Sequence, residues 1–177
     1  QVTAWTNHIK NSDKFLDQLA FATMENDLPN RIKLLKLLLE KDPSNSTIEF
    51  LIAETCSLLK DKSPCNHIHY ENLNVFNTDN GMVIDIQFIN AYQNGDSDLA
   101  LQMLTNAGNT KFNSDFSYEI FRNAEQSMVN FGFPQDINLV VSIVGINAGR
   151  PSANPMLISS ACKDNYSNQE WQSACYS

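Results

Sequence analysis

The residues best suited to chemistry in this chain are a cysteine and two histidines that lie close together in sequence, Cys65, His67 and His69. Thiolate and imidazole groups are ligands that zinc prefers, and Cys65 and His69, four positions apart, would share one face of a helix. His67 then lies on another face. A closed zinc site needs four ligands, and His8 is the only other histidine of the chain. We expect a half-exposed polar helix face here; a metal- or cofactor-binding protein or enzyme that uses these three residues is the alternative.

The four cysteines suit a second kind of chemistry, because they form two pairs that are local in sequence. Cys56 precedes Cys65 by nine positions, and Cys162 precedes Cys175 by thirteen. An even number of cysteines in local pairs is typical of disulfides in oxidising compartments, although reduced cysteines are also common in protein cores. A turn expected at residues 60–63 would fold the first pair together. We therefore expect the disulfides Cys56–Cys65 and Cys162–Cys175 and a periplasmic or extracellular location; four free thiols would indicate the cytoplasm.

Two pairs of carboxylates could act in general acid–base catalysis, namely Asp96 with Asp98 and Asp115 with Glu119. Asp96 and Asp115 stand at expected helix starts, where a carboxylate caps backbone N–H groups and favours the helix dipole. The sequence contains no Gly-x-Ser-x-Gly motif, phosphate loop, His-Glu-x-x-His motif or dinucleotide fingerprint. We expect a non-enzymatic protein without a cofactor.

The composition is that of an ordinary globular protein and excludes some partners. The 177 residues suit one domain with a sizeable core. The net charge of −8 is concentrated in residues 63–177, which hold four Lys/Arg against eleven Asp/Glu. This acidic part would repel phosphate backbones, so we expect no nucleic-acid partner. The longest apolar run, residues 137–146, is about half the ~20 residues needed to cross a bilayer, so we expect no transmembrane segment.

Caps, glycine stops and prolines divide the chain into helices joined by short turns. The expected helices cover residues 3–24, 27–41, 46–59, 63–76, the pair within 79–108, 114–132, 152–164 and 168–176. The first residues of the 46–59 helix, Ser46 to Glu49, fit a capping box. The β-branched run at 137–146 suits either a buried strand or a buried helix. We expect the helix, because a single strand among helices has no partner for its backbone groups.

Helices joined by short turns form antiparallel hairpins, which bury their apolar faces by stacking on one another. The hairpin at 79–108 resembles a unit of the tetratricopeptide-repeat family, in which glycine lies near the turn and alanines lie where the helices cross. The matching positions are Gly95, Ala100, Leu104 and Ala107. Phe88 departs from the pattern, because the family has a small residue at its position, and Ile84 replaces a bulkier aromatic residue.

A weaker match to the same family lies upstream. Residues 42–45 resemble the entry turn of a unit, and Ile52, Ala53 and Cys56 fall at the apolar, small and aromatic positions of its first helix. The resemblance covers residues 27–108. It implies an all-α fold of stacked antiparallel helical hairpins in a right-handed superhelix like that of tetratricopeptide repeats. We expect one repeat domain over 1–177, with its clearest hairpins at 46–76 and 79–108 and a terminal hairpin at 152–176.

The resemblance also implies a function, because helical repeats present surfaces that bind a protein or a peptide. Exposed aromatic residues would line such a groove, and Tyr92 and Tyr118 are the candidates. Phe116 and Phe121 are expected to fill the core instead. The sequence names neither the partner nor the oligomeric state.

Overall fold

The computed structural model describes residues 1–65, 79–150 and 156–176 of the chain. The described residues fold into α-helices and one short 3-10 turn, and they contain no strand beyond an isolated bridge between Asn80 and Phe112. The prediction of an all-α fold is therefore confirmed. The right-handed superhelix of tetratricopeptide type stays a prediction, and most of the expected helix at 63–76 lies outside the described residues.

The chain folds into two compact units, each made from two separate stretches of sequence. Unit 1 comprises Gln1–Cys65 and Phe116–Pro151, and unit 2 comprises Asn66–Asp115 and Ser152–Ser177. The helices of unit 1 are α1 (Val2–Asn11), α2 (Phe15–Met24), α3 (Leu28–Lys41), α4 (Ser46–Leu58), the 3-10 turn η1 (Ser63–Cys65), α7 (Ser117–Phe131) and α8 (Ile137–Ala148). Those of unit 2 are α5 (Gly81–Gln93), α6 (Ser97–Ala107), α9 (Met156–Asp164) and α10 (Gln169–Tyr176). The assignment of 1–177 to one repeat domain stays a prediction.

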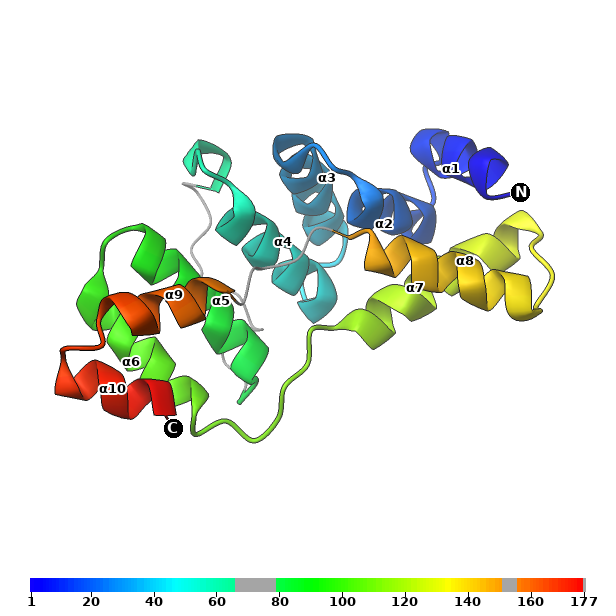
Figure 1. The fold of residues 1–177 in the computed structure, drawn as a ribbon. Helices are drawn as coiled ribbons and strands as arrows, with labels where there is room; N and C mark the ends of the chain where they lie inside the picture. The colour runs from blue at the N-terminus through cyan, green and yellow to red at the C-terminus, as the bar shows by residue number, and fades with distance from the viewer. Residues whose placement is uncertain (66–78, 151–155, 177) are drawn as a thin grey trace. The chain divides into compact units, whose positions relative to one another are not determined.

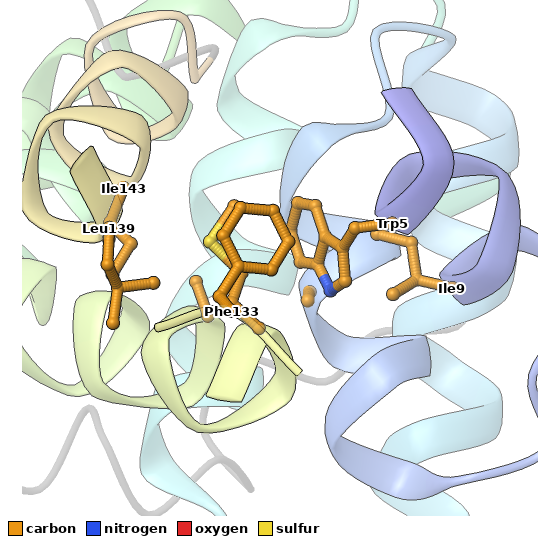
Figure 2. Close-up of a cluster of buried hydrophobic side chains, with 8 residues drawn as sticks. Trp5, Ile9, Phe133, Leu139 and Ile143 are labelled. Carbon is orange, nitrogen blue, oxygen red and sulfur yellow. The ribbon is translucent and has the colours of Figure 1, made fainter. Parts of the chain in front are cut away.

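In unit 1, helix α2 packs against both α3 and α7 (Figure 1). The α3–α4 and α7–α8 pairs form hairpins, so α2 joins a hairpin that follows it directly to one that lies far along the chain. The core beside α2 is built from buried residues of α1, α2, α7 and α8 and of the α7–α8 connection, and Figure 2 shows it. These residues are Trp5, Ile9, Ala20, Ala124, Met128, Phe133, Leu139 and Ile143.

In unit 2, the predicted hairpin of α5 and α6 is present. Gly95 in its turn has a φ of 78°, a conformation that glycine adopts without steric cost, and the Asp96 side chain accepts a hydrogen bond from the Leu99 N–H at 3.1 Å. Helices α9 and α10 pack against this hairpin. The ring of Phe88 stacks on Tyr92 and meets Trp171 edge-on, so the bulky residue at the expected small position forms part of the core.

The prediction of one continuous helix at 3–24 was wrong, because helix α1 ends at Asn11 and a second helix, α2, begins at Phe15. Ser12 has an extended backbone, and its hydroxyl donates a 2.7 Å hydrogen bond to the carboxylate of Asp17. The buried carboxylate thus holds the residue that ends α1.

The predicted caps of two other helices were also wrong. Asn45 rather than Ser46 caps α4, because the Asn45 side chain accepts from the Ile48 N–H at 3.2 Å. Helix α7 begins at Ser117, after Phe116 in a left-handed conformation, rather than at Ser114. Ser114 is held elsewhere: its N–H donates to the Asn80 side chain at 2.9 Å, and its carbonyl accepts from that side chain at 2.8 Å.

The apolar run at 137–146 lies in helix α8, which confirms the helix and excludes the strand. The expectation that this helix is buried was wrong. Leu139 and Ile143 face the core, but several of its other apolar side chains lie in solvent. Periodicity could not reveal this, because α8 has apolar residues on two opposite faces and only one of these faces has a neighbour within unit 1.

Candidate protein-docking surface

Cys56 and Cys65 are joined by a disulfide, with their Cα atoms 6.0 Å apart, and Cys162 and Cys175 form a second one. Both predicted pairings are therefore present. The first disulfide is buried and ties η1 to the end of α4, where the Lys62 ammonium group donates to the Cys56 carbonyl at 2.8 Å. Closing so short a loop stabilises the fold by roughly 2–3 kcal/mol. Two disulfides are compatible with an oxidising extracellular or periplasmic compartment.

The metal-binding alternative loses its sulfur ligand, because a disulfide-bonded Cys65 has no thiolate to offer. His67 and His69 lie outside the described residues. Among the residues that are described, no group of three or more His, Cys, Asp or Glu side chains could hold a metal ion. No helix in that part of the chain combines the length and apolar character required to cross a membrane.

The two carboxylate pairs lie at the starts of α6 and α7. Asp96 caps α6, as predicted, and Asp98 lies exposed in the first turn of the same helix. Asp115 does not cap α7, since Phe116 occupies the N-cap position, and Glu119 lies exposed in the first turn.

A cluster that the sequence did not reveal brings a serine, an aspartate and a histidine together in unit 1. The Ser127 hydroxyl donates to one oxygen of the buried Asp17 at 2.6 Å, and His8 Nε2 lies 3.2 Å from the other oxygen. In a catalytic triad the imidazole lies between serine and carboxylate, whereas here the carboxylate lies between the other two. Ser127 is fully buried and also accepts a 3.0 Å hydrogen bond from Trp5 Nε1. The cluster therefore holds helices together and offers no exposed nucleophile.

This cluster predicts an acid-sensitive contribution to stability. Burial alone would raise the pKa of Asp17, but the hydrogen bonds from Ser127 and Ser12 and the nearby His8 outweigh it and lower the pKa below 3.8. A lowered carboxyl pKa stabilises the fold above the unfolded-state pKa of about 4, and this contribution is lost as the pH falls through the folded-state pKa. We expect the free energy of unfolding to fall less steeply below about pH 4 in Asp17→Asn than in the wild type. Urea titrations at several pH values test this, with Asp13→Asn as the exposed control, and equal slopes in the wild type and Asp17→Asn would contradict it.

A second buried polar cluster joins α3, α4 and the end of α8. Glu54 accepts a 2.7 Å charged hydrogen bond from Arg150 Nη1, and Arg31 Nη2 lies 3.6 Å from the same carboxylate oxygen. The three side chains are almost completely buried. Burial lowers the pKa of Arg31 to about 10, although the charge of Glu54 opposes this change. The guanidinium groups are committed to structure, and Arg150 fixes the chain directly after α8.

The exposed apolar side chains of α8 form the surface that we call the α8 stripe. Ile137, Val140, Val141 and Val144 are 71%, 45%, 63% and 53% exposed. Their spacing of three, four and seven positions places them on one face of the helix. No residue of α8 carries a charge. The stripe is therefore a continuous apolar ridge, whereas single exposed apolar residues elsewhere need no explanation.

The two predicted groove residues lie in different units. Tyr118 on α7 is 67% exposed, and the Arg122 guanidinium lies over its ring and donates to its hydroxyl at 3.1 Å. Tyr92 on α5 is half-buried between Phe88 and Trp171. The part of these two tyrosines in ligand binding stays a prediction.

No protein family, curated protein or solved structure matches this chain. The resemblance to tetratricopeptide repeats therefore stays a prediction.

Proposed function

We propose that this protein is a non-enzymatic binding module of the periplasm or the extracellular space, and that its α8 stripe docks an amphipathic helix of a partner protein. The exposure of Ile137, Val140, Val141 and Val144 on one helix face supports this proposal. The two disulfides support the compartment, because such bonds persist where the surroundings are oxidising.

Without a binding partner, the stripe exposes apolar surface to water, which is unfavourable in free energy. An apolar helix face is normally buried, and unit 1 covers α8 only on the face of Leu139 and Ile143. Covering the other face would remove apolar surface from water at roughly 25 cal/mol per Å². This driving force is available to a partner without any rearrangement of unit 1.

The spacing of the stripe forms a ridge along α8 against which a partner helix can pack. Anchors at positions i, i+3, i+4 and i+7 are those used when an amphipathic helix packs against an apolar surface. All four anchors are β-branched, so each has a restricted χ1 angle and loses little conformational freedom when it is covered.

Other occupants fit the stripe less well. A membrane-surface helix usually carries Lys and Arg beside its apolar face, whereas α8 has none and the chain carries a net charge of −8. A stable dimer interface uses about 20–30 residues on each side, far more than the four anchors of the stripe. A single partner helix requires only these anchors.

A display library tests the proposal. Helical peptides with apolar residues at i, i+3, i+4 and i+7 would be selected on the full chain and counter-selected on Val141→Asp, which places a charge in the middle of the stripe. We expect peptides that require the wild-type stripe and that stop binding when a central proline breaks their helix. Leu99→Asp, on the exposed surface of α6 in unit 2, is the control and should retain binding.

Three outcomes would overturn the proposal. A library that yields no peptide able to distinguish the wild type from Val141→Asp would exclude a helical partner at the stripe. A dimer in sedimentation that Val141→Asp dissociates would assign the stripe to a second copy of the chain. Binding to anionic vesicles that the same variant abolishes would assign it to a lipid surface.

A further inference from the structure

Unit 2 carries a groove that is separate from the α8 stripe and has different chemistry. It runs between α6 and α10, which lie side by side in Figure 1, and has a volume of about 350 Å³. Its lining residues come from one face of each helix and the end of α6: Leu101, Thr105 and Asn109 on one side, and Glu170, Ser173 and Ala174 on the other. The disulfide between Cys162 and Cys175 fixes α10 to α9, so the α10 wall is held in place.

The polar groups of the α6 wall present mainly acceptors to the groove. The Thr105 hydroxyl donates to the Leu101 carbonyl at 2.9 Å, and the Asn109 amide nitrogen donates to the Thr105 carbonyl at 3.0 Å. The Thr105 hydroxyl donor and one of the two N–H donors of the Asn109 amide are thus engaged along α6, whereas the lone pairs of the Thr105 hydroxyl and the Asn109 side-chain oxygen can accept from a ligand. Such a wall favours a ligand that brings N–H donors.

The opposite wall supplies a full negative charge. Glu170 is exposed in the first turn of α10, and no ion-pair partner for it occurs within the described part of the chain. Unit 2 as a whole holds two Lys/Arg against eight Asp/Glu, so its field attracts cations toward the groove. Of the two lysines of unit 2, Lys111 is already paired with Asp79 at 2.6 Å.

The apolar lining completes the match to a particular side chain. Leu101 and Ala174 offer an apolar contact between the acceptor wall and Glu170. Arginine and lysine combine an alkyl stem, which packs on apolar surface, with a cationic head that donates several hydrogen bonds. We infer that the α6–α10 groove binds a basic peptide segment, with an arginine or lysine stem on Leu101 and Ala174 and its cationic head at Glu170.

The test uses two end-blocked hexapeptides, Gly-Leu-Arg-Gly-Leu-Arg and its counterpart with glutamate at both arginine positions. Each is titrated into the full-length protein labelled with ¹⁵N, at about 0.15 M salt, where long-range attraction is screened. We expect the arginine peptide to shift the amide signals of α6 and α10 saturably, and the glutamate peptide to shift none.

Two matched variants separate the groove from the general acidity of unit 2. Glu170→Gln and Asp98→Asn each remove one exposed carboxylate from the first turn of a helix, but only Glu170 lines the groove. We expect Glu170→Gln to weaken binding of the arginine peptide about threefold to fivefold, as for one exposed ion pair, and Asp98→Asn to leave it unchanged.

Three results would overturn the inference. Equal weakening by both variants would show attraction to the whole unit rather than to the groove. Equal binding of the two peptides would show a purely apolar contact. No saturable shift of the groove amides with the arginine peptide would remove the site. The α8 stripe lies in unit 1 and is unchanged in every protein of this test, so none of these results depends on it.

Discussion

Replacing Glu54 by glutamine is expected to destabilise unit 1 by about 3–5 kcal/mol, because it leaves buried arginines without the carboxylate that they share. Arg150 loses a charged hydrogen bond of 2.7 Å, and Arg31 loses the negative charge that opposes the lowering of its pKa by burial. Both guanidinium groups are buried, and a protein interior penalises the loss of a neighbouring opposite charge. The contact that joins the chain directly after α8 to α4 would also be weakened.

The two tryptophans allow this loss to be assigned to one unit. Trp5 lies in the core of unit 1 and Trp171 in that of unit 2, so a Trp171→Phe background leaves one fluorescent reporter in unit 1. Urea unfolding followed at Trp5 should show the loss for Glu54→Gln. Glu40→Gln makes the same change at an exposed site on α3 and should stay within about 0.5 kcal/mol of the background. A Glu54→Gln effect as small as that of the control would contradict the buried ion cluster.

Replacing Trp5 by alanine is expected to destabilise the protein by about 3–5 kcal/mol, the usual loss for a buried tryptophan. Trp5 is fully buried where α1 meets the core of unit 1, and Figure 2 shows its ring among Ile9 and Phe133. The change leaves a cavity and also removes the hydrogen bond that Trp5 Nε1 donates to Ser127.

Phenylalanine at the same position separates the two contributions. Trp5→Phe keeps most of the ring and loses the N–H donor, so its loss should be smaller, on the order of 1–2 kcal/mol. Unfolding of both variants in urea, followed by far-ultraviolet circular dichroism, measures the difference. A loss of less than about 1 kcal/mol for Trp5→Ala would mean that α1 is not fixed to the core through this residue.

Features set by neighbouring residues could be predicted from the sequence. Asp27 caps α3 and Asp96 caps α6 through hydrogen bonds to N–H groups three residues on, and Gly132 ends α7 with a φ of 104°. The disulfides belong to the same class, because each pair is joined across a short stretch of chain.

Features set by distant residues could not be predicted. Ser114 does not cap α7, because Asn80, thirty-four positions earlier, binds both its N–H and its carbonyl. The contact of Asp17 with Ser127 joins residues 110 positions apart and has no sequence signal. The α8 stripe escaped prediction for a related reason, since an apolar pattern reports the preference for burial and does not report which neighbours are available.

The direct test of the docking surface is a calorimetric titration of one selected helical peptide into three proteins: the wild type, Val141→Asp and Leu99→Asp. Trp5 fluorescence, read in a Trp171→Phe background, first establishes that unit 1 of each variant is folded. The docking account predicts that Val141→Asp weakens binding at least about tenfold, or 1.4 kcal/mol, while Leu99→Asp binds as the wild type does. Equal affinity of the peptide for all three proteins would contradict it.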